Sequence, residues 1–178
     1  GAEQMQAAID TGADVVLAGR TTDTATIAAL PLARGAHAGG AWHGAKIAEC
    51  GAFCTTRPAS GVIMVSFDAA GFTVTPMGDG VRCTPQSVAA HMLYESSDPW
   101  ILYEPGGHLD VTAARYSVAG DGSVRVEGAA WVPASSYGVK LEGARRAGYQ
   151  TMMLAVIRDP RYVAAAADWA DRLLVHCR

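Results

Sequence analysis

The chain has 178 residues, of which 50% are hydrophobic and 17% charged; this balance is typical of a globular chain with an apolar core and excludes intrinsic disorder. The formal net charge of −3 argues against a chain-wide basic surface for nucleic acid or anionic lipid. The sequence contains no apolar run long enough to cross a bilayer and does not open on a secretory signal. We therefore expect a cytoplasmic protein that binds neither nucleic acid nor membrane.

The cysteines and the missing motifs limit the chemistry. Cys50, Cys54, Cys83 and Cys177 include no C-x-x-C pair, so we predict free thiols in a reducing compartment and no bound metal. No glycine-rich nucleotide loop or phosphate loop is present, so we predict no cofactor.

Residues 1–57 are predicted to form an α/β segment. A helix is expected over Glu3–Thr11, and the continuous apolar run Asp14–Ala18 is typical of a parallel-type strand buried on both faces. A polar loop and a helix up to Leu30 follow, and another helix is expected from Ala41 to about Phe53. A lone buried strand leaves both of its edges unpaired. We therefore expect this segment to be the end of a larger α/β domain, completed by an oligomer partner, a second polypeptide or a preceding segment.

Residues 58–178 are predicted to form an α+β domain. The expected elements are two antiparallel hairpins, a helix capped by Thr84 with Pro85 in its first turn, two further strands and a C-terminal helix. The hairpins are Val62–Phe67 with Phe72–Thr75 and Arg115–Val118 with Val124–Glu127, the further strands are Tyr137–Leu141 and Tyr149–Ile157, and the helix is Pro160–Leu174.

The loop Gly19–Thr24 is the first candidate site, because ligands of α/β sheets bind beyond the carboxyl ends of strands. Arg20 offers a fork to a carboxylate or phosphate, Asp23 an acceptor or base, and Thr22 a hydroxyl. In the competing interpretation, Thr22 or Asp23 only caps the following helix and Arg20 forms a local ion pair.

Two histidines are candidate general bases. His43 shares a helical stripe with Ile47, Cys50 and Cys54, which favours a core position over a metal site; on the same predicted helix, Lys46 and Glu49 are spaced for an ordinary surface pair.

His91 lies on one predicted helix face with Ser87 and Glu95, which indicates either an acid–base line or a solvated face with a His–Glu pair.

Two further segments are candidate binding elements. Glu104, Gly106 and Gly107 form a charged loop tip that either approaches a ligand or makes a tight turn. Lys140 lies between apolar residues and shares a strand face with Glu142; it either stabilises an enolate or binds a carboxylate, or it forms a structural cross-strand ion pair.

Six strings, in this order along the chain, together resemble the acyclic terpene utilisation (AtuA-like) family: ADVVLAGRTTDTA, AWHGAKIAECGA, RCTPQSVAAHMLYE, EPGGHLD, YGVKLEGARRAGYQT and IRDP. The resemblance covers essentially the whole chain. It implies a cytoplasmic protein of acyclic terpenoid and branched-acid catabolism, often found beside acyl-CoA enzymes, with an α/β segment preceding the part seen here.

These features lead to two hypotheses. The first is a lyase or hydratase, or the second half of one, that acts on a small carboxylate or its acyl-CoA thioester. His91 or His43 is then the base, Arg20 the carboxylate anchor, and Lys140 or the Gly106–Gly107 amides the enolate stabiliser. The second is a non-catalytic subunit that docks on a partner chain.

Overall fold

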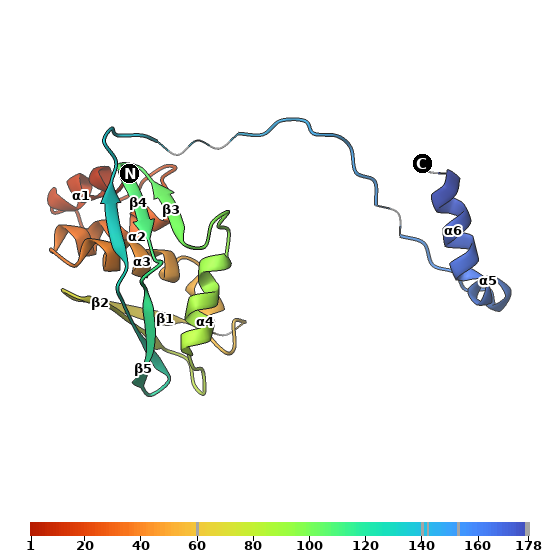
Figure 1. The fold of residues 1–178 in the computed structure, drawn as a ribbon, viewed down its shortest axis with the longest axis horizontal. Helices are drawn as coiled ribbons and strands as arrows, with labels where there is room; N and C mark the ends of the chain where they lie inside the picture. Colours follow the sequence, from red (N-terminus) through yellow and green to blue (C-terminus); the bar gives the residue numbers. More distant parts are fainter. Residues whose placement is uncertain (60, 140, 142, 153, 177–178) are drawn as a thin grey trace. The chain divides into compact units, whose positions relative to one another are not determined.

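The structure is a computed structural model that describes residues 1–59, 61–139, 141, 143–152 and 154–176 (Figure 1). The chain divides into two units, Gly1–Leu141 and Glu142–Arg178. The predicted boundary between residues 57 and 58 stays a prediction.

Three helices open the first unit. They are α1 (Ala2–Asp10), α2 (Asp23–Ala33) and α3 (Ala38–Ala48), and each packs against the next. Thr22 caps α2 by accepting a hydrogen bond from the Ala25 amide at 3.2 Å, as its residue type favours. A short 3₁₀ helix, η1 (Gly51–Cys54), follows α3 after a left-handed turn at Cys50.

Two antiparallel sheets make up the rest of this unit. The larger has the order β1-β2-β6-β5, built from β1 (Ile63–Phe67), β2 (Gly71–Pro76), β5 (Arg115–Gly120) and β6 (Ser123–Glu127). The smaller has the order β3-β4-β7, built from β3 (Ile101–Glu104), β4 (Gly107–Asp110) and β7 (Ala130–Pro133). Both predicted hairpins, β1–β2 and β5–β6, are confirmed.

The helix predicted at Thr84-Pro85 is confirmed at its start. Thr84 accepts from the Ser87 amide at 3.0 Å while Ser87 Oγ accepts from the Thr84 amide at 2.9 Å, which is a reciprocal cap. The α-helix α4 (Pro85–Ala90) then tightens into the 3₁₀ helix η2 (His91–Leu93), so Glu95 lies beyond the helix.

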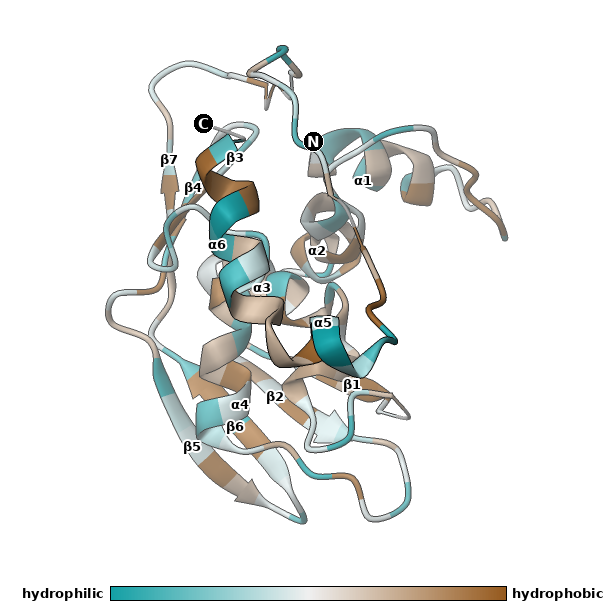
Figure 2. Ribbon diagram, turned by 90° about the vertical axis from the view of Figure 1, so that its right-hand side faces the viewer, coloured by the Kyte–Doolittle hydropathy of each residue, from teal (hydrophilic) through white to brown (hydrophobic). Residues whose placement is uncertain are grey.

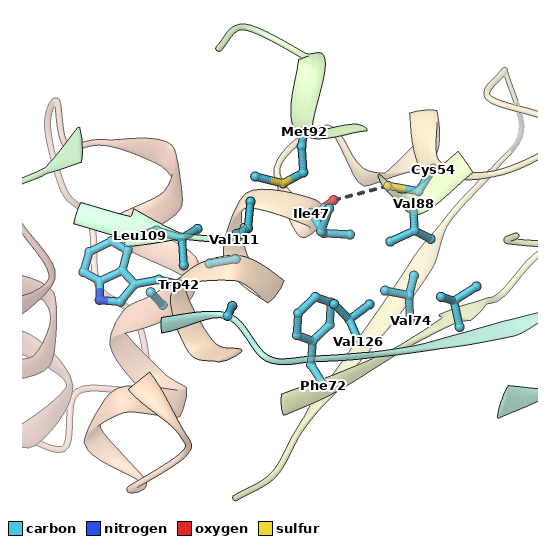
Figure 3. Close-up of a cluster of buried hydrophobic side chains, with 14 of the residues drawn as sticks. Trp42, Ile47, Cys54, Phe72, Val74, Val88, Met92, Leu109, Val111 and Val126 are labelled. Carbon is cyan, nitrogen blue, oxygen red and sulfur yellow. Dashed lines mark hydrogen bonds between the residues drawn. The ribbon is translucent and has the colours of Figure 1, made fainter. Parts of the chain in front are cut away.

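The apolar core gathers around α3 (Figure 3). Phe72 and Val126 of the larger sheet meet Ile47 of α3, and all three side chains are fully buried. On the side of the smaller sheet, Trp42 of α3 stacks on Trp131 of β7 with ring centroids 4.7 Å apart. The helix therefore joins the two sheets.

Close approach of α3 to its neighbours depends on three of its glycines. A Cβ atom at Gly39 would overlap the carbonyl oxygen of Ala129, just before β7, and one at Gly40 would lie 2.9 Å from Gly71 Cα in β2. A Cβ at Gly44 would come closer than van der Waals contact to two phenyl rings, that of Phe67 in β1 and that of Phe72 in β2. Larger residues at these positions are incompatible with the packing.

The predicted buried parallel strand over Asp14–Ala18 is wrong. These residues form no strand, Val15 and Leu17 are 81% and 98% exposed, and every strand pairing in the described chain is antiparallel. Among the described residues, no strand lies beside this apolar run to supply backbone hydrogen bonds. A strand without paired neighbours is not stable in water.

The two further predicted strands and the C-terminal helix also differ from expectation. At the end of the first unit, the described residues of Tyr137–Leu141 form no strand, and in the second unit those of Tyr149–Ile157 form none. The single predicted C-terminal helix is two helices, α5 (Pro160–Ala164), capped by Asp159, and α6 (Ala166–His176). Apolar and polar residues alternate around α6 (Figure 2), but none of its described side chains is buried.

None of the helices in the described ranges is long and apolar enough to span a membrane.

Substituting Gly39 tests the α3 packing. We expect Gly39→Ala to lower the free energy of unfolding by about 1–3 kcal/mol, because the added methyl group meets backbone that has no room to move. The control is Gly19→Ala, whose Cβ meets open space and should change stability by less than about 0.5 kcal/mol. Urea unfolding measures both; equal stabilities of the two variants would contradict the packing described here.

Candidate functional site

A buried ion pair lies at the C-terminal end of α3. Lys46 Nζ is 3.1 Å from Glu49 Oε2, and the two side chains are only 6% and 11% exposed. Thr24, in the first turn of α2, donates its hydroxyl to the same carboxylate oxygen at 3.3 Å. Lys46 and Glu49 therefore form an interior ion pair and not the predicted surface pair. Charged side chains are rarely buried, and those that are buried occur often at functional sites.

His91, the first residue of η2, lies next to this ion pair. Its Nε2 lies 2.7 Å from the backbone carbonyl oxygen of Glu49, and because a carbonyl only accepts, Nε2 carries the proton. Burial lowers the pKa of His91, and the charge of Lys46 lowers it further, against opposing contributions from Glu49. The ring is thus neutral at neutral pH, with its lone pair on Nδ1.

The Nδ1 atom of His91 is buried and has no hydrogen-bond partner. The residue as a whole is 4% exposed. Buried polar atoms are paired in most native structures, so an unpaired one calls for an explanation.

Tyr94 covers the histidine. The two rings stack with centroids 5.4 Å apart, and Lys46 Nζ lies 5.6 Å from the centroid of the Tyr94 ring. The phenol donates to Cys50 Sγ at 3.5 Å, and this hydrogen bond, with desolvation, raises the pKa of Tyr94. We call Thr24, Lys46, Glu49, His91 and Tyr94 the Lys46–His91 cluster.

The cluster combines an unprotonated imidazole nitrogen, an ammonium group and a protonated phenol. A neutral imidazole is suited to accept a proton, and a fixed cation in a site with little water stabilises developing negative charge. The arrangement therefore fits proton transfer on an organic anion. Among the described residues, no group of three or more His, Cys, Asp and Glu side chains is arranged to hold a metal ion.

The predicted loop Gly19–Thr24 reaches this cluster at one end. Thr22 is the cap of α2 and Asp23 is an exposed residue of its first turn. The next residue, Thr24, makes the contact to Glu49, and Arg20 is exposed four positions earlier. The loop predicted to carry a site is thus continuous with the cluster.

His43 lies elsewhere, in the core. It is fully buried, with Nε2 3.1 Å from the Tyr116 hydroxyl and its ring edge-to-face with Phe72. Burial lowers the pKa of His43 to about 3. Its stripe partners Ile47 and Cys54 are buried as well, in keeping with the core interpretation.

The other predicted residues belong to the smaller sheet or are not described. Glu104, Gly106 and Gly107 form the β3–β4 turn, where Gly106 has φ +84°. A Cβ atom at Gly107 would lie 2.5 Å from the carbonyl oxygen of Val132 in β7, so this glycine permits the close approach of β7 to β4. Lys140 lies outside the described residues.

Comparison with known proteins finds the same family that the six strings of the sequence resemble. The model of the acyclic terpene utilisation family protein AtuA matches residues 1–176. The chain belongs to the AtuA family. Searches of curated proteins and of solved structures gave no match. Family membership connects the protein with acyclic terpene utilisation but does not specify a reaction.

The buried histidines of this AtuA family protein make its stability depend on pH. A histidine whose folded pKa is lowered binds its proton in the unfolded chain, so stability is full above the unfolded pKa of about 6.5 and falls as the pH drops below it. Because the folded pKa of His43 is about 3, this residue alone should lower the free energy of unfolding of the protein by about 2 kcal/mol between about pH 7 and about pH 5.

Urea unfolding at these two pH values measures the loss. His43→Gln should remove most of it, and the exposed control His176→Gln should leave it unchanged. The same pH slope in both variants would contradict the buried neutral state of His43.

The cysteines are predicted to differ in reactivity. Cys50 is exposed, whereas Cys54 and Cys83 are buried free thiols, and burial raises the pKa of Cys54 to about 12 and also raises that of Cys83. Because the thiolate is the nucleophile, brief alkylation of the native protein should modify Cys50 and spare Cys54 and Cys83 until denaturant is added. Peptide mass spectrometry identifies the sites; native modification of Cys54 at the rate of Cys50 would refute this order.

Proposed function

We propose that this AtuA family protein is a lyase or hydratase that acts on a small carboxylate or its acyl-CoA thioester, with the Lys46–His91 cluster as its catalytic centre. The observation that carries the proposal is the neutral, buried imidazole of His91, whose Nδ1 has no partner and which lies beside the buried Lys46–Glu49 ion pair. A neutral base and a fixed cation are the two groups that proton removal next to a carbonyl requires.

The proposed reaction breaks a C–H bond next to the carbonyl. His91 Nδ1 takes the proton, and the electron pair moves onto the carbonyl oxygen, where the Lys46 ammonium stabilises the enolate. The hydroxyl on the neighbouring carbon then leaves, a carbon–carbon double bond forms, and the proton from His91 joins the departing hydroxide as water. Hydration is the reverse sequence.

Access to His91 requires movement of the residues that cover it. Nδ1 has no exposed surface, and Tyr94, at the end of η2, stacks on the ring. Tyr94 precedes Glu95, which has φ +51°, a conformation that non-glycine residues rarely adopt. In the proposed mechanism, Tyr94 moves aside when substrate binds.

The predicted binding residues complete the proposal. Arg20, with Thr22 and Asp23 in the same loop, anchors the carboxylate or the thioester's phosphates. His43 serves the core, and Lys140 and the Glu104–Gly107 turn stay candidates for substrate contact.

Substitution of His91 tests the assignment. His91→Gln keeps a side-chain N–H for the Glu49 carbonyl and removes Nδ1, so turnover should fall by about 100-fold or more with a small change in Tm. The assay follows water loss from a panel of β-hydroxyacyl-CoA thioesters and, independently, deuterium exchange next to the carbonyl. The control His108→Gln, in β4, should retain full activity; unchanged turnover in His91→Gln would overturn the assignment.

A second candidate function is a non-catalytic subunit. The observation that favours it is the exposed apolar run Asp14–Ala18, in which Leu17 is 98% exposed. A second chain co-purifying in fixed ratio, together with no turnover by either preparation, would support this function over the enzyme.

A further inference from the structure

A groove of about 500 Å³ lies between the last turns of α2 and the β1–β2 hairpin. Ile27, Leu30 and Pro31 line it from the helix, and Val65 and Phe67 line it from β1. The volume falls within the range of roughly 300–1,000 Å³ that is usual for small-molecule sites. It is a separate place from the Lys46–His91 cluster, which meets α2 at its first turn through Thr24.

The walls of the groove are apolar and incompletely covered. Leu30 is 47% exposed, and Ile27, Val65 and Phe67 are half-buried. A hydrocarbon chain lying in the groove removes this surface from water, which stabilises the complex by roughly 25 cal/mol per Å² of apolar area.

One carboxylate and one guanidinium line the groove. The carboxylate, that of Asp68, is already paired, because Arg125 donates to both of its oxygens, at 2.6 and 2.9 Å, and also to Glu127 at 3.1 Å. Arg34 also lines it and is exposed, and its guanidinium has no carboxylate partner among the residues that the structure describes.

The carbonyl groups at the end of α2 are also occupied. The Leu30 carbonyl accepts from the Arg34 amide at 3.0 Å, and the Pro31 carbonyl accepts from the Ala36 amide at 3.0 Å. The groove therefore offers apolar walls and one guanidinium, that of Arg34, which forms no ion pair with a described carboxylate.

We propose that this groove binds an anionic amphiphile, a carboxylate with a medium-length hydrocarbon chain. The chain lies against Leu30 and Phe67, and the carboxylate pairs with the guanidinium of Arg34, whose planar fork matches two carboxylate oxygens. The proposal does not depend on the reaction proposed at the cluster, because it concerns binding at the other end of α2.

Calorimetric titration with octanoate, a carboxylate with a medium-length hydrocarbon chain, tests the proposal on the full chain. Arg34→Gln should raise the Kd by roughly fivefold or more, and Leu30→Glu should abolish binding because it places a carboxylate in the groove. The neutral alcohol octanol should bind more weakly than octanoate, with a Kd that Arg34→Gln leaves unchanged.

Two matched controls lie on β5, at the far edge of the larger sheet from β1. Arg115→Gln removes the same charge, and Val118→Glu adds a carboxylate at a residue that is 73% exposed; both variants should bind octanoate like the unchanged protein. Absence of binding, equal losses in the controls, or loss of binding in His91→Gln with retention in Leu30→Glu would overturn the proposal. So would concentration-dependent self-association that Leu30→Glu abolishes, because the groove would then be an interface between copies.

Discussion

The contact on which the rest of the structure depends is the close approach of α3 to the backbone of both sheets. Gly39 faces the chain before β7 and Gly40 faces β2, so the helix axis is held near both sheets where any side chain would keep it away. Trp42 and Ile47 then fill the space on either side. A helix fixed in this way at its start has little freedom at its end, where Lys46 and Glu49 lie.

The position of α3 explains the electrostatics of the Lys46–His91 cluster. Burial of Lys46 and Glu49 costs solvation free energy, which their ion pair and the Thr24 hydroxyl offset in part. Burial makes protonation of His91 unfavourable and lowers its pKa, and the positive charge of Lys46 acts in the same direction, against opposing contributions from Glu49. The result is a base that stays neutral beside a cation, and this combination carries the proposed chemistry.

The sequence predicts those elements whose signals are local. Thr84-Pro85 begins a helix and Asp121-Gly122 turns a hairpin because caps and turns depend on neighbouring residues alone. The run Asp14–Ala18 misleads for the opposite reason: a two-sided apolar strand exists only if other strands flank it, and its composition says nothing about which strands do.

The candidate site was only partly predictable. Residue type and position single out His91 and the loop leading to Thr24, whereas the spacing of Lys46 and Glu49 predicts a surface pair. A spacing of three residues on a helix is the same for exposed and buried pairs. Their burial follows from η2, whose His91 contacts the Glu49 carbonyl across 42 residues of sequence, and a single sequence carries no signal of that contact. Lysine is scarce, with only Lys46 and Lys140 in the chain, and this scarcity is the one sequence feature that singles out Lys46.

The state of the His91 ring tests the central claim most directly. Nitrogen-15 NMR of the labelled protein distinguishes the two neutral tautomers and the imidazolium, and titration follows the same signals with pH. The account predicts a neutral ring at pH 7, protonated on Nε2 and unprotonated on Nδ1, that titrates below the ordinary histidine value of about 6.5. A proton on Nδ1, or an imidazolium at pH 7, would contradict it.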